Sequence, residues 1–240
     1  MNARHARVPL VSFGLVTSFG LVTAADLVSL AIGYDIGHTV AKPLLMPLLA
    51  AYAHVSGGPR MLVAALLFGW GGDVLLLTDA EPAFLAGMAS FAAGHVCYLL
   101  LFRQAAAPIG RSRPRAPGSW LTAAAYAVAL GTTVTLLWPG LPADLRVPVA
   151  GYSLLLTAMA YGAARLGPVA ALGGVLFLLS DTLIASGVAE WPQLPRPDFW
   201  IMITYLAAQY LLARGALKVF GARSESSEPS EPSVEVTVAD

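Results

Sequence analysis

The chain has little charge, one cysteine and few histidines, and each shortage excludes a class of protein. Charged residues make up 12% of the 240 residues, whereas a soluble domain carries about 25%. The formal net charge is zero, so nothing indicates a nucleic-acid partner. The single cysteine, Cys97, excludes an internal disulfide and a cysteine metal cluster.

Long apolar stretches take up most of the sequence. Apolar residues account for 57% of the chain, and a membrane-spanning helix needs roughly 17–25 mostly apolar residues. Strand alternation at barrel spacing is absent, which favours a helical bundle over a barrel. The sequence therefore predicts an all-α, multi-pass integral membrane protein with about eight transmembrane helices, at residues 8–32, 40–55, 60–78, 82–102, 119–138, 147–165, 168–188 and 199–220.

The basic residues predict the orientation of these spans. If the N-terminus is cytoplasmic, all lysines and arginines lie inside except Lys42, Arg146 and Arg196, in agreement with the positive-inside rule. We therefore expect both termini to be cytoplasmic, and we expect the protein in a bacterial cell membrane. Residues 1–25 also have the pattern of a secretory signal, but the apolar sequence continues to Ile32.

Two segments differ from the apolar spans. Residues 222–240 are rich in Ser, Glu and Pro, which predicts a disordered cytoplasmic tail after a transmembrane domain at 1–221. Residues 103–118 form a basic, Pro-rich loop. We expect this loop either to lie against anionic headgroups or to be a solvated linker.

Two predicted spans carry an acid inside an apolar stretch. Asp73 follows two glycines, and Asp181 follows Ser180. An acid within a membrane span is expensive and usually functional, although each could instead hydrogen-bond helices together. Two carboxylates in a dry site do not ionise easily together, which gives a protonated acid beside an ionised base. Such a pair suits acid-catalysed hydrolysis through a cation, as at an acetal or enol ether.

Further polar residues fall between the predicted midplane and the outer surface. Lys42, His95, Tyr205 and Gln209 share this depth, so we expect them to bind substrate. Each also has a structural interpretation. Lys42 suits a lysine that snorkels to the interface, His95 suits a core histidine, and Tyr205 and Gln209 suit packing or hydrogen-bonding partners. Asp26 is expected to be a capping or interfacial acid.

Other chemistries fit less well. The sequence contains no Gly-x-Ser-x-Gly, and Ser180 has no evident base, which disfavours a serine nucleophile. One histidine lies deep in a span, so we expect no metal site, and a metal-dependent lipid amidase or a receptor-like bundle is disfavoured. The alternative class is a small transporter of protons or cations that uses the same aspartates. A weak internal repeat, in which residues 60–102 resemble residues 168–220, is compatible with a transporter. A transporter should have a polar route to both faces of the membrane, however, and the inner halves of these spans are apolar, which favours a pocket open to one side.

An ordered set of residues runs through the predicted spans. The set comprises Lys42-Pro43, Phe68 with Gly72-Asp73, Gly87 with Phe91, His95 and Tyr98, Gly174 with Phe177 and Ser180-Asp181, and Tyr205 with Gln209. In this order and on eight spans, the set resembles the lysoplasmalogenase-like YhhN family of integral membrane proteins. One departure is local: the family often has a serine after the first Phe, where this chain has Gly69.

The resemblance implies an integral membrane hydrolase for lysophospholipids within membrane lipids. It would cleave the vinyl ether of lysoplasmalogens to a fatty aldehyde and a glycerophospho-ethanolamine or -choline, without a metal or other cofactor. Asp181 and Asp73 would be the catalytic pair, as acid and base respectively or with these roles reversed. Lys42 would hold the substrate phosphate, and His95 and Tyr205 would position water or the headgroup.

Overall fold

The computed structural model describes residues 3–78, 80–106 and 119–226, which form eight helices and no strand. This confirms the prediction of an all-helical bundle. The helices are α1 (Ala3–Ile32), α2 (Asp35–Val55), α3 (Arg60–Leu75), α4 (Glu81–Ala106), α5 (Ser119–Leu137), α6 (Arg146–Ala164), α7 (Pro168–Val188) and α8 (Pro197–Ser226).

Most helix boundaries lie close to the predicted spans. The largest differences are at α1, which begins at Ala3 rather than at residue 8, at α2, which begins at Asp35 rather than at residue 40, and at α8, which continues to Ser226 rather than ending at residue 220. Most of the basic loop (107–118) and the tail from residue 227 onwards lie outside the described residues.

Five helices, α1, α4, α5, α6 and α7, are long and apolar enough to cross a membrane. Of the other three, α3 has only 16 residues, and α2 and α8 are less apolar. Their polar side chains face inward: Lys42 of α2, Asp73 of α3 and Gln209 of α8 are all buried. The composition and the bundle are those of an integral membrane protein.

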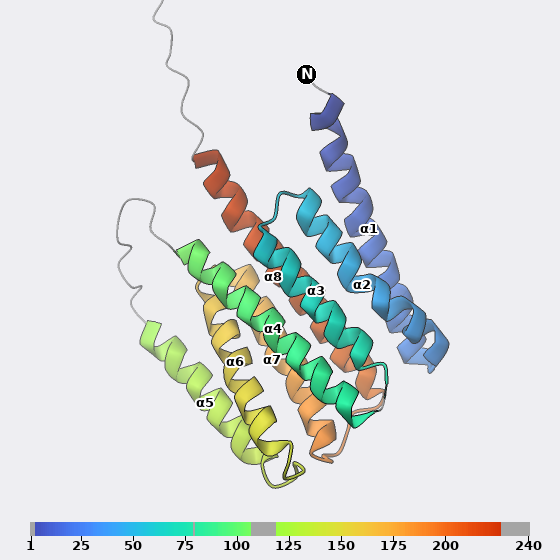
Figure 1. Ribbon diagram of the computed structural model, residues 1–240, viewed down its shortest axis with the longest axis vertical. Helices are drawn as coiled ribbons and strands as arrows, with labels where there is room; N and C mark the ends of the chain where they lie inside the picture. Colours follow the sequence, from blue (N-terminus) through green and yellow to red (C-terminus); the bar gives the residue numbers. More distant parts are fainter. Residues whose placement is uncertain (1–2, 79, 107–118, 227–240) are drawn as a thin grey trace, which may run out of the picture.

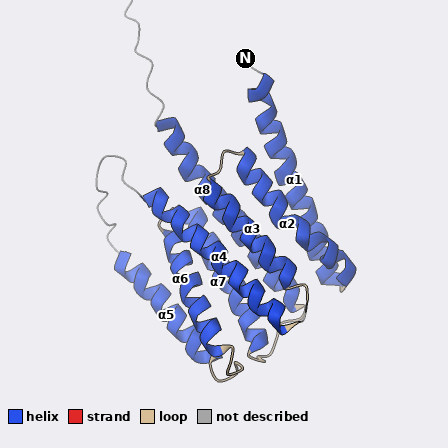
Figure 2. Cartoon of the chain, in the orientation of Figure 1, coloured by secondary structure: helices blue, strands red, loops and turns tan. Residues whose placement is uncertain are grey.

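The helices alternate in direction along the bundle (Figure 1), and the loops that join them are drawn in Figure 2. In order of contact, α1, α2, α3, α4, α6, α7 and α8 form a closed series, because α8 packs against both α7 and α1. α8 also touches α2 and α3, while α5 lies at the edge against α6 and α7. The start of α1 and the end of α8 lie at the same end of the bundle.

Glycine allows α6 and α7 to approach closely. A Cβ atom on Gly174 would lie 2.9 Å from the Cα atom of Ala160 and 3.1 Å from its carbonyl oxygen. These are backbone atoms, which cannot rotate away as a side chain can. Small residues at such contacts let membrane helices pack through their backbones, and this contact holds the helix that carries Asp181.

We expect Gly174→Leu to destabilise the bundle, by about 1–3 kcal/mol as in other overpacked cores. The matched control is Gly151→Leu on α6, because Gly151 is exposed and a Cβ atom there meets nothing within 4 Å. The measurement is the apparent melting temperature of each purified variant in detergent. Equal melting temperatures for the two variants would contradict this account of the α6–α7 contact.

Candidate active site

Asp73 ends a chain of hydrogen bonds that crosses three helices. Its side chain is 3% exposed, and Tyr205 of α8 donates to its Oδ2 atom at 2.8 Å. Gln209, one turn further along α8, donates from Nε2 to the Tyr205 hydroxyl at 3.2 Å. The Gln209 Oε1 atom accepts a hydrogen bond from Tyr98 of α4 at 2.7 Å. Three residues predicted as site residues therefore lie together.

The glycines of α3 make room for these partners. A Cβ atom on Gly69 would lie 2.9 Å from Nε2 of Gln209 and 3.0 Å from the hydroxyl of Tyr205. A Cβ atom on Gly72 would lie 2.4 Å from the ring of Phe91. Larger residues at these positions would displace the groups around the nearby carboxylate, so the glycines serve the packing of α4 and α8 against α3.

Asp181 has its own chain of partners. The hydroxyl of Tyr152, on α6, makes a short hydrogen bond to Asp181 Oδ2. The same hydroxyl lies 3.0 Å from Nε2 of His95, whose side chain is 1% exposed. His95 and Asp181 are thus joined through Tyr152, a residue that sequence reasoning missed. The predicted span 147–165 contains a second tyrosine, Tyr161, and the sequence offered no signal to choose between them.

The surroundings of the two acids meet at one aromatic side chain, Phe177. Asp73 and Asp181 are close enough to interact electrostatically. The ring of Phe177 packs edge-on against His95, with 4.9 Å between ring centroids, and against Tyr205 at 5.5 Å. Phe177 therefore contacts both hydrogen-bond chains and keeps the space between them apolar.

A cavity of about 500 Å³ lies between α4, α5, α6 and α7. Asp181 is the one carboxylate among the described residues that line it, with Tyr152 beside it. The rest of the lining is mostly apolar and includes Met88, Leu130, Leu156 and Val175. Small-molecule sites typically measure about 300–1,000 Å³. The cavity therefore offers an apolar space beside one acid.

Lys42 lies on α2, outside the cavity lining. It is 9% exposed and interacts electrostatically with Asp73. The next residue, Pro43, accepts a hydrogen bond from the indole of Trp70 on α3 at 2.9 Å. Its carbonyl is free to do so because Pro47 has no N–H group to donate along the helix. This bond fixes the Lys42 segment against α3.

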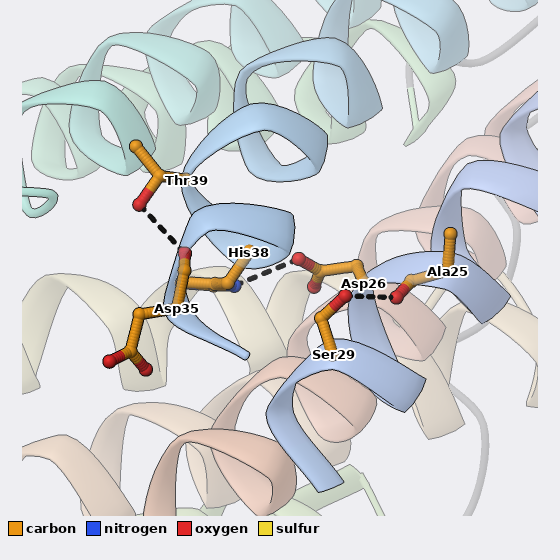
Figure 3. Close-up of polar contacts among 6 residues, drawn as sticks. All are labelled: Ala25, Asp26, Ser29, Asp35, His38 and Thr39. Carbon is orange, nitrogen blue, oxygen red and sulfur yellow. Dashed lines mark hydrogen bonds and ion pairs between the residues drawn. The ribbon is translucent and has the colours of Figure 1, made fainter. Parts of the chain in front are cut away.

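Asp26 differs from the expectation of a capping or interfacial acid. It lies inside α1, six residues before the helix ends at Ile32, and its side chain is fully buried. The Nδ1 atom of His38, on α2, lies 2.8 Å from its Oδ1 atom (Figure 3). The capping interpretation is wrong because α2 packs over this part of α1, and sequence spacing alone did not show that contact.

We expect Tyr152→Phe to lower the stability of the protein. The change leaves the Asp181 carboxylate and the His95 ring without their shared partner, and an unsatisfied buried polar group costs about 1–3 kcal/mol. The matched control is Tyr161→Phe, on the same helix, where the ring packs against Tyr126. Apparent melting temperatures in detergent measure the effect. A loss no greater than that of the control would contradict the bridging role.

Fold and site together define a helical membrane protein with a buried acid, Asp73, and a part-buried acid, Asp181, which lines a mostly apolar cavity. The chain belongs to the YhhN family, whose profile matches residues 37–216. The matched region contains every predicted site residue, as well as Tyr152, whereas Asp26 precedes it. No solved structure matches the chain.

Relatives of known name come from animals and bacteria. Lysoplasmalogenase TMEM86B of Homo sapiens is 37% identical over 164 residues, which cover 68% of this chain and 66% of the human protein. The Rattus norvegicus protein of the same name is 33% identical over 185 residues, or 76% of this chain and 73% of the relative. Lysoplasmalogenase of Mycobacterium tuberculosis is 32% identical over 193 residues, or 75% and 71%. The match therefore spans slightly less than two thirds of the human relative.

Proposed function

We propose that this protein is a membrane hydrolase that cleaves the vinyl ether bond of lysoplasmalogens. The products would be a fatty aldehyde and a glycerophospho-ethanolamine or -choline. The observation that carries the proposal is the position of Asp181 in the wall of a mostly apolar cavity, within electrostatic reach of a buried acid, Asp73. Membership of the YhhN family and relatives named lysoplasmalogenase support the choice of substrate.

The cavity suits the hydrocarbon chain of such a substrate. Its apolar wall, provided by α4, α5, α6 and α7, gives a long alkenyl chain an environment like the lipid it leaves. Asp181 would then lie beside the vinyl ether group, at the end of the alkenyl chain. On the far side of the acid pair, Lys42 would hold the phosphate as a point charge. An amphiphilic substrate would thus lie across the two acids.

The reaction would begin with proton transfer. Asp181 in its protonated form gives its proton to the vinyl carbon that is not bonded to oxygen, and the remaining carbon becomes an oxocarbenium-like cation. The hydroxyl of Tyr152 can donate to the carboxylate that this step creates, since the two groups are already hydrogen-bonded. His95, hydrogen-bonded to the same hydroxyl, would keep Tyr152 oriented.

Water would complete the reaction. Asp73 in its ionised form stabilises the cation and accepts a proton from the attacking water, which adds its oxygen to the cationic carbon. The resulting hemiacetal gives its hydroxyl proton to Asp181 and breaks its bond to the glycerol oxygen, which takes up the proton held by Asp73. Both acids thus return to their starting forms, and one aldehyde and one alcohol are released for each water consumed. Tyr205 and Gln209 would hold Asp73 in place through the hydrogen bonds described above.

We expect Asp73→Asn and Asp181→Asn each to lower aldehyde release from lysoplasmalogen by at least about a hundredfold, the usual contribution of a general acid or base. Both amides keep the size of the side chain, so folding should be retained. Asp144→Asn is the control, because Asp144 is exposed in the α5–α6 loop. Undiminished activity in both variants would sink the assignment. Ion flux into proteoliposomes without hydrolysis would instead favour a transporter.

We also propose that the reaction needs no metal ion. Among the described residues, no three His, Cys, Asp or Glu side chains gather as a metal site requires. Aldehyde release should therefore persist after exhaustive treatment with a chelator. Complete loss of activity that added zinc restores would contradict this proposal.

A further inference from the structure

Two charged side chains near Asp73 are incompletely paired. Asp26 is fully buried, and its Oδ2 atom accepts no hydrogen bond from the described residues. Lys42 is 9% exposed and makes no ion pair or hydrogen bond within the same part of the chain. Asp73 interacts electrostatically with both. A buried polar atom without a partner is expensive, so the free oxygen of Asp26 and the unpaired ammonium of Lys42 indicate a ligand that carries both charges.

The structure holds Asp26 in a defined position. His38 fixes its Oδ1 atom at 2.8 Å, and Figure 3 shows the carboxylate directed from α1 toward α2. Ser29, although nearby, bonds to the carbonyl oxygen of Ala25 at 2.8 Å and not to the acid. Lys42 lies four residues after His38 and so shares its face of α2. The free carboxylate oxygen and the ammonium group therefore belong to one helix interface.

We propose that Asp26 and Lys42 form the headgroup site for a phosphoethanolamine lipid. Lys42 binds the phosphate, and Oδ2 of Asp26 accepts a hydrogen bond from the primary ammonium group. This inference rests on the proposed function, because it assigns the polar end of the same substrate. Helix α3, which carries Asp73, packs against α2 and against α4, a helix of the cavity wall, in the order of groups that a lysoplasmalogen requires.

The arrangement favours ethanolamine over choline. A primary ammonium group carries N–H donors that match a carboxylate oxygen lacking a donor. The quaternary ammonium of choline carries three methyl groups and no N–H, so it leaves that oxygen unsatisfied. The preference therefore comes from the N–H donors and not from the size of the headgroup.

Binding of lipids that cannot be hydrolysed tests the site. The probes are acyl lysophosphatidylethanolamine and lysophosphatidylcholine of equal chain length, titrated against the full-length protein in detergent and followed by thermal stabilisation. We expect the wild type to bind the ethanolamine lipid at least about tenfold more tightly, as one charge-assisted hydrogen bond provides. Asp26→Asn should remove this difference, whereas Lys42→Met should weaken both lipids.

The matched control is Asp35→Asn, which removes an exposed acid that lies near His38 in Figure 3. It should leave the preference unchanged. Equal affinity of the wild type for both lipids, or an unchanged preference in Asp26→Asn, would overturn the proposal. A merely structural role for Asp26 would change both affinities alike.

A second series needs no variant. Affinity should fall stepwise from ethanolamine through its N-methyl and N,N-dimethyl forms to choline, and a flat series would also overturn the proposal. Because the probes lack a vinyl ether, this result is independent of hydrolysis. An ethanolamine preference without aldehyde release from lysoplasmalogen would reject the proposed function alone, whereas aldehyde release without the preference would reject the headgroup site alone.

Discussion

The burial of carboxylates among apolar helices is the constraint on which the rest of this structure depends. A charged group in such surroundings is tolerated only when polar partners are close. Tyr205 supplies a hydroxyl to Asp73, and Tyr152 supplies one to Asp181. Each donor comes from a helix other than the one that carries its acid, so the bundle must bring these helices together before either acid has a partner.

These hydrogen bonds join the two halves of the weak internal repeat of the sequence. The acid of α3 is bonded by a residue of α8, and the acid of α7 is linked through Tyr152 to His95 of α4. The helix pairs α3–α4 and α7–α8 are thus joined at their polar residues. Phe177 packs against His95 of one network and Tyr205 of the other, so the two networks share an apolar contact.

The two sides of the acid pair differ in polarity. On one side, α4 to α7 enclose a mostly apolar cavity with Asp181 in its wall. On the other, α1 and α2 bring Lys42, Asp26 and His38 near Asp73. Such a gradient suits an amphiphile whose reactive bond lies where its tail meets its headgroup.

The sequence by itself determined the fold class, most helix boundaries and the two acids, because apolar runs and rare intramembrane charges are properties of short segments. It also marked the ordered set that places the chain in the YhhN family. Only the tertiary structure decided which side chains meet. The sequence did not show which of Tyr152 and Tyr161 contacts Asp181, and it did not show that Asp26 is covered by α2. Both contacts depend on how one helix is rotated against another. That rotation is set by packing, as at Gly69 and Gly174, and not by the period of the sequence.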